Sequence, residues 1–245
     1  MQFDVISAIG ITVGAAIVTA TLAFALSRSI VGRLRAVAVV GAWFAVVGML
    51  GATGALSAQG IGVAGLGAAV ILPATLLCWM WLAAGPMREA MSAVPVPTLI
   101  AVNALRILGI TFVLLFAAQR LPAPFAPAAG WGDVLIGITA GPVAWILARR
   151  STGARSLALA WNALGMLDLL VAVALGATSS PGPARLFMDP PGSAIMTTPP
   201  WILIPCFIVP VLIALHVAIF DRLARTEEAG SLAYRLERSS THAVN

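Results

Sequence analysis

Seven long apolar runs constrain the fold of this chain more than any other feature. Each run can cross a bilayer, because a helix rises about 1.5 Å per residue and the hydrocarbon core is about 30 Å thick. All backbone groups in that core must be bonded within the protein, and runs of this length achieve this as helices. The runs span Val5 to Leu26, Ala36 to Leu56, Val63 to Ala84, Thr98 to Ala118, Ala128 to Ala148, Ser156 to Ala177 and Trp201 to Phe220. The sequence therefore predicts an all-α, polytopic integral membrane protein with seven transmembrane helices.

The composition argues against a second, soluble domain. Of the 245 residues, 60% are hydrophobic and only 9% are charged, whereas soluble domains carry about 25% charged residues. We expect one transmembrane domain over residues 1–222 and a cytoplasmic tail over 223–245, in which Leu232, Tyr234 and Leu236 predict a short helix on the membrane surface. The first run is too long for a signal peptide and follows no basic segment, so we interpret it as a retained helix.

The placement of arginine predicts the orientation. All 14 basic residues are arginine, and the side opposite the cytoplasm would carry only two of them, Arg120 and Arg185. Since basic connections stay in the cytoplasm, we expect the N-terminus outside and the C-terminus in the cytoplasm. The absence of lysine and the wealth of Ala and Gly suggest a bacterial protein of the plasma (inner) membrane. The connections after runs one, three, five and seven hold Arg28, Arg33, Arg35, Arg88, Arg149, Arg150, Arg155, Arg222, Arg225, Arg235 and Arg238.

The net charge of +5 does not indicate a nucleic-acid partner. The arginines lie singly or in small groups between apolar runs, whereas phosphate binding needs a stripe along one exposed face. Cys78 and Cys206 fall inside apolar runs, where a thiol usually serves packing. They indicate neither a disulfide framework nor a metal site.

Charged residues inside the runs are the strongest functional signal, because each costs at least about 2.5 to 3.5 kcal/mol in hydrocarbon. Asn103 and Arg106 share a face of the fourth run, with Arg106 near the midplane. Trp161, Asn162 and Asp168 share a stripe of the sixth run, and Asp168 has a similar depth. We therefore predict that Arg106 and Asp168 meet directly or through water, so that loss of either leaves an uncompensated buried charge. An ion pair that only fixes helix register is the alternative.

Two further ionisable residues extend this polar set. Asp133 lies near the outer boundary of the fifth run, within reach of Gln119, Arg120 or Arg106. His216 in the seventh run lies level with the two asparagines, either as a hydrogen-bonded structural residue or as a proton carrier or ligand. Together these residues form a polar track across the bundle, with Asp133 outermost, the Arg106 and Asp168 pair central, and His216 innermost.

The residue types exclude several cofactors. Seven helices in this orientation look like the microbial rhodopsins, but retinal needs a lysine and the chain has none. Haem needs paired histidines, and zinc hydrolases need several histidine and carboxylate ligands, which His216 alone cannot supply. We therefore expect no cofactor and no metal.

Two membrane families share single features with the chain. Residues Gly130 to Asp133 match the GxGD motif of intramembrane aspartyl proteases, with Asp168 as the second carboxylate, but that family has the reverse order of aspartates and a later Pro-Ala-Leu element. Sugar carriers of the SWEET type share the topology, but their internal repeat and Pro-Gln signature are absent here.

A broader pattern over runs four to seven resembles bacterial seven-helix membrane proteins of no assigned activity. The resemblance implies a fold and no particular reaction. It is carried by Asn103, Arg106, the Gly-Trp-Gly-Asp string ending at Asp133, Trp161-Asn162, Asp168, Ile204-Pro205, Val209-Pro210 and His216.

Three functions follow from these residues as competing hypotheses. The first is a cavity in helices four to seven that binds a small polar or anionic ligand at Arg106, for transport or sensing. The second is a membrane enzyme that uses Asp133 or Asp168 as acid or base, and the third is a non-catalytic assembly or scaffold protein. Small residues in runs one and two also predict close packing, either internal or between copies in a homo-oligomer. The outer connection 178–200 caps a cavity if Leu186, Phe187 and Met188 are protected from solvent.

Overall fold

The computed structural model describes residues 10–17, 29–83, 85, 88–89 and 92–225. The predicted first span is described only over residues 10–17, which are helical. The rest of that span and the predicted surface helix around Leu232, Tyr234 and Leu236 lie outside the described residues. Residues 223–225 continue the last helix, so the predicted boundary of the tail at 223 falls inside a helix.

The described residues contain six helices that are long and apolar enough to cross a membrane. They are α2 (Ile30–Ala52), α3 (Gly62–Leu82), the composite helix Val96–Ala117, α7 (Phe125–Ala148), α8 (Ala154–Thr178) and the last helix, Ile204–Arg225. Each corresponds to one of the predicted runs two to seven. The all-helical, multi-pass architecture is therefore confirmed, with six spans described.

Predicted boundaries agree to within about four residues except at the start of α2 and at the end of the last helix, which continues to Arg225 rather than Phe220. The Ser29 side chain accepts a hydrogen bond from the backbone N–H of Gly32 at 3.0 Å, which caps a helix that begins at Ile30 rather than Ala36. Arg33 and Arg35 thus lie on the first turns of α2 instead of in a connection.

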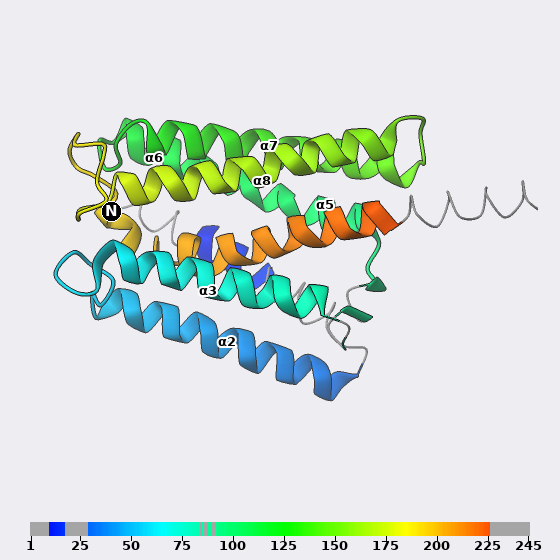
Figure 1. Ribbon diagram of the computed structural model, residues 1–245, viewed down its shortest axis with the longest axis horizontal. Helices are drawn as coiled ribbons and strands as arrows, with labels where there is room; N and C mark the ends of the chain where they lie inside the picture. The colour runs from blue at the N-terminus through cyan, green and yellow to red at the C-terminus, as the bar shows by residue number, and fades with distance from the viewer. Residues whose placement is uncertain (1–9, 18–28, 84, 86–87, 90–91, 226–245) are drawn as a thin grey trace, which may run out of the picture.

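Successive spans run in opposite directions along the long axis of the bundle (Figure 1). The connections α3 to α5 and α7 to α8 lie at the same end as the start of α2 and the end of the last helix. The arginines of these segments that the structure describes therefore gather at one end of the bundle, as the positive-inside rule requires.

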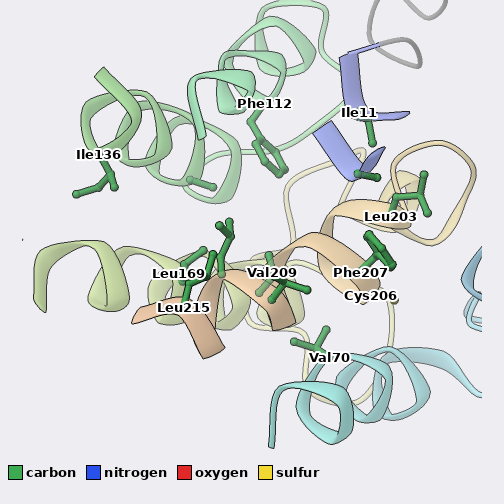
Figure 2. Packing of buried hydrophobic residues seen from close by; sticks show 14 of the residues in the cluster. Ile11, Val70, Phe112, Ile136, Leu169, Leu203, Cys206, Phe207, Val209 and Leu215 are labelled. Carbon is green, nitrogen blue, oxygen red and sulfur yellow. The ribbon is translucent and has the colours of Figure 1, made fainter. Parts of the chain in front are cut away.

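The last helix is the centre of the bundle. More than half of its most apolar stretch is buried inside the protein, against 17% for α2 and for α3. The ring of Phe207 packs against Trp43 and Phe44 of α2, at centroid distances of 4.6 and 5.6 Å. Figure 2 shows Phe207, Val209 and Leu215 of this helix between Val70 of α3 and the side chains of α6 to α8. The helices α2 and α3 therefore dock mainly on the last helix and leave their other faces exposed.

Two spans contain a segment that departs from regular α-helix, one in the middle of its span and one at the start. The fourth is built from α5 (Val96–Val102), the 3-10 segment η1 (Asn103–Gly109) and α6 (Ile110–Ala117). The last helix begins with the π-helical segment η3 (Ile204–Ile208), which contains Pro205. Pro205 lies in the first turn of this segment, a position where a missing N–H is tolerated. Such segments inside helices are frequent at functional sites, and both border the polar residues described below.

Small residues bring the backbones of η1 and α7 together. A Cβ atom on Gly137 would lie 2.5 Å from the backbone nitrogen of Ile107, so only glycine permits this approach. One turn further along α7, a Cβ on Gly141 would meet nothing within 4 Å. The close contact is therefore a local property of the level at which Arg106 lies.

The small residues of the first two runs have mixed surroundings. A Cβ on Gly14 would lie 3.0 Å from Leu108 of η1, and one on Gly51 would lie 2.9 Å from Ile202, so both sites pack internally. Among the described residues, none has an atom within 4 Å of a Cβ added to Gly41 or Gly48 of α2.

The outer connection does not cover the bundle with its central apolar residues. Leu186 and Met188 are 71% and 69% exposed, whereas Phe187 is half-buried, so Leu186 and Met188 do not form a lid. The Arg185 side chain donates instead to the backbone carbonyls of Phe187 and Met188, which turns this part of the loop outward. The following residues return to the bundle, where Ser193 and Met196 are buried.

Candidate functional site

Arg106 lies at the centre of the polar residues and is 3% exposed. It projects from η1 into the space between α7, α8 and the last helix. Its Nε donates to Asp133 Oδ1 at 2.7 Å, and its Nη2 donates to Asp168 Oδ2. Its Nη1 donates to the Gly165 carbonyl at 3.0 Å and lies 3.2 Å from His216 Nε2. The guanidinium thus joins four spans. We call Arg106, Asp133, Asp168 and His216 the charged cluster.

The expected contact between Arg106 and Asp168 is present, and Asp133 is a second carboxylate on the same guanidinium. Asp133 therefore contacts Arg106 rather than forming the interfacial pair considered from the sequence. Each carboxylate binds a different nitrogen of Arg106. This arrangement differs from an aspartyl dyad, in which two carboxylates share one proton.

Glycine makes room for the second carboxylate. A Cβ on Gly132 would overlap Asp168 Oδ1, so the glycine next to Asp133 lets α8 bring its own aspartate against α7. The Gly-Trp-Gly-Asp string therefore has a packing function here: its glycines admit the neighbouring helices, and its aspartate binds Arg106.

His216 is held by a reciprocal pair of bonds with Asn162. His216 Nδ1 lies 2.7 Å from Asn162 Oδ1, and Asn162 Nδ2 donates to the His216 carbonyl at 2.9 Å. Arginine can only donate, so His216 Nε2 must accept from Arg106. The proton of a neutral imidazole then resides on Nδ1 and is donated to Asn162. His216 and Asn162 are both fully buried, so His216 faces the bundle interior and not lipid.

Trp161 and Asn103 lie beside this cluster without bonding to it. Trp161 Nε1 donates to Thr139 Oγ1 of α7 at 2.9 Å, and its ring centroid lies 5.9 Å from that of His216. Asn103 Nδ2 donates to the Leu99 carbonyl at 3.1 Å. Asn103 Oδ1 is buried and has no partner among the described residues. Residues three apart in a 3-10 helix eclipse one another, so Asn103 lies under Arg106 on the same face.

The predicted grouping of Asn103, Asn162 and His216 at one level is therefore only partly reproduced. Asn162 and His216 are bonded, but Asn103 is not joined to them by a hydrogen bond in the described structure. Thr139 and the Gly165 carbonyl were not predicted as partners. Trp161 indicated the need for an acceptor, because a buried indole N–H usually has one, but the sequence did not show which helix supplies it.

With both carboxylates ionised, the cluster would carry one negative charge in excess. Two carboxylates face one guanidinium, and the hydrogen bonds assign a neutral imidazole to His216. Charge in the membrane interior is costly, so a further positive charge or a proton would stabilise the cluster. Among the described residues, no group of three or more His, Cys, Asp and Glu side chains could hold a metal ion.

A cavity of about 50 Å³ lies beside the cluster, between residues 10–17, η1 and the last helix. We call it the cluster cavity. Arg106 and Asp133 provide its polar wall, and its other walls are apolar, among them Ile11, Leu108 and Leu212. Asp133 is therefore the carboxylate that a small molecule in this cavity would meet.

Asn162 provides a test of how the cluster is held. Asn162→Ala should lower the free energy of unfolding by about 1 to 3 kcal/mol, because it leaves His216 Nδ1 without its buried partner. Chemical unfolding in detergent measures this. Thr53→Ala, which removes only exposed bonds within α2, is the control and should change the value by less than about 0.5 kcal/mol. Equal effects of the two changes would contradict the role assigned to Asn162.

Comparison with known proteins gives one family match. The family described as "Domain of unknown function (DUF8737)" matches residues 63–224, which include α3, all later spans and every residue of the charged cluster. No curated protein and no solved structure matches the chain.

Proposed function

We propose that this chain, which belongs to the DUF8737 family of unknown function, binds a small polar ligand at the charged cluster inside the membrane, for transport or sensing. The observation that carries the proposal is the charge balance of the cluster. The buried guanidinium of Arg106 and two partly buried carboxylates lie beside a cavity, where an unbalanced charge is expensive. A purely structural ion pair would need only one carboxylate.

The same balance favours a proton or a cationic group as the bound species. An anion at Arg106 would have to compete with Asp133, Asp168 and the Gly165 carbonyl for the guanidinium donors. A proton or an ammonium group would instead neutralise the excess charge, and Asp133 lines the cavity through which it could arrive. We therefore specify the ligand as one that brings a proton or a positive charge.

Native mass spectrometry and infrared spectroscopy of the purified protein test this proposal together. We expect either a bound small molecule or the carbonyl band of a protonated carboxyl group, and we expect that signal to disappear in Asp168→Asn combined with Asp133→Asn. Gln119→Ala, outside the cluster, should retain it. If the wild-type protein shows neither signal, the excess charge has no ligand and the proposal fails.

The orientation and location belong to the same proposal: a bacterial plasma membrane, with the N-terminus outside and the arginine-rich end in the cytoplasm. With Cys78 and Cys206 replaced by alanine, Met188→Cys should react with an impermeant maleimide in intact cells. Ser151→Cys, at the opposite end of the bundle, should react only after permeabilisation. The reverse pattern would invert the topology.

We also propose that copies of the chain associate through α2. The open space at Gly41 and Gly48 supports close approach of another helix. Native mass spectra report the number of copies, and Gly48→Leu should shift the distribution to monomers. Spectra that contain only monomers for the wild-type protein would refute this association.

A further inference from the structure

A second cavity adjoins the cluster cavity and differs from it in chemistry. It encloses about 70 Å³ between α3, α8, the outer connection and the last helix, and we call it the apolar cavity. Its walls include Val70, Ala172, Gly176 and Met196. The hydroxyl of Ser193, which also lines it, already donates to the Gly176 carbonyl at 2.7 Å. The apolar cavity therefore suits a hydrocarbon group.

Three side chains line both cavities: Phe112, Ile204 and Val209. The two spaces are thus separated by the thickness of these side chains. Figure 2 shows Phe112 extending from α6 towards the helix that carries Val209. Its ring packs edge-on against Phe125 at a centroid distance of 5.5 Å. Phe112 is the largest of the three and the principal partition.

The other side of the partition is formed by an irregular backbone. Ile204 begins the π-helical segment η3, and Val209 follows its end. Segments of this kind often occur at functional sites because their bonding differs from that of the flanking helix. The wall between the cavities therefore coincides with the departure from regular structure in the last helix.

We propose that the two cavities form one site for an amphipathic cation, with its ammonium group beside Asp133 and its hydrocarbon part in the apolar cavity. This inference rests on the proposed function and names the ligand class. The apolar cavity is about half the size of the roughly 150 Å³ cavity that accepts benzene. The apolar cavity can therefore accommodate a short aliphatic chain. To enter it from the cluster cavity, this chain must displace the Phe112 side chain.

Primary n-alkylamines from propylamine to heptylamine are the probes, with the n-alcohols of equal length for comparison. Binding to the purified protein is measured by calorimetry in detergent. For amines the affinity should rise about fourfold with each methylene that enters the apolar cavity, the factor that corresponds to about 0.8 kcal/mol. The rise should stop once the cavity is filled, and Asp133→Asn should remove the preference for amines over alcohols.

Gly67→Leu tests the role of the apolar cavity directly. Gly67 lines this cavity, and a Cβ added there meets nothing within 4 Å, so leucine fills the space without a backbone clash. The variant should keep the affinity for propylamine and lose the gain with chain length. Gly141→Leu, equally free of contacts among the described residues but on α7 and outside the lining of both cavities, is the matched control and should bind the amines as wild type does.

The possible outcomes separate the inference from the proposed function. Binding of propylamine that depends on Asp133 but does not increase with chain length would overturn the inference and leave the proposed function intact. A chain-length effect that persists in Gly67→Leu would also overturn it. If no amine binds while the infrared band of a protonated carboxyl is present, the ligand is a proton and the amphipathic site is refuted.

Discussion

Replacement of Arg106 by leucine should lower the free energy of unfolding by about 3 to 5 kcal/mol, the cost of breaking a buried ion pair from one side. The variant leaves Asp133 and Asp168 facing each other without a cation and removes the donor that His216 and the Gly165 carbonyl share. Chemical unfolding in detergent, followed by circular dichroism, measures the loss.

Asp168→Asn should cost much less, although the sequence alone predicts a similar loss for either partner. The reason is that Asp133 also pairs with Arg106. Without Asp168, Arg106 still pairs with Asp133 and the cluster becomes neutral, and an asparagine oxygen can still accept from Nη2. The combined variant R106L/D133N/D168N should recover much of the stability lost in R106L. Equal losses for Arg106→Leu and Asp168→Asn would show that Asp133 does not compensate Arg106.

Depth in the membrane could be predicted from the sequence, because a helix rises by a constant amount per residue. That is why the contact between Arg106 and Asp168 was predicted from two spans that are far apart in the chain. The buried position of His216 follows the same logic. Six of the seven predicted spans are present among the described residues, with most ends within a few residues of the prediction, since length and hydropathy decide them.

Lateral neighbours could not be predicted in the same way. The partner of Asp133 depends on which face of α7 meets η1, and the 3-10 segment alters that relation. A 3-10 helix rises about 2.0 Å per residue instead of about 1.5 Å, so η1 carries Arg106 further along the helix axis, towards Asp133, than a regular helix would. No residue in the run Asn103–Gly109 predicts the change from α-helix to 3-10 helix.

The contact between His216 and Arg106 has a related explanation. The sequence predicts that His216 lies closer to the cytoplasmic boundary than Arg106 does, level with Asn103 and Asn162. In the structure, His216 Nε2 contacts the guanidinium. A guanidinium lies at the end of a long side chain, and the position of the Cα does not define its level. The depth of the Cα therefore does not by itself define which groups a long side chain contacts.

Gly137→Ala should be a damaging change on α7 although it adds only one methyl group. The added Cβ would lie 2.5 Å from the backbone nitrogen of Ile107 and 2.9 Å from its Cγ1. A backbone atom cannot rotate away, so η1 or α7 must shift, and Arg106 is the residue before Ile107. Forcing extra volume into a packed interior costs about 1 to 3 kcal/mol and sometimes more. Chemical unfolding in detergent measures this cost.

Gly141→Ala is the matched control, one turn along the same helix. Its Cβ would meet nothing within 4 Å, and alanine favours a helix over glycine by up to about 1 kcal/mol. This variant should therefore be as stable as wild type or slightly more stable. If the close approach positions the cluster, Gly137→Ala should also weaken propylamine binding, because displacement of η1 moves Arg106 relative to Asp133. If Gly137→Ala unfolds like Gly141→Ala, η1 and α7 can separate at no cost. Gly137 would then have no role in holding Arg106 in place.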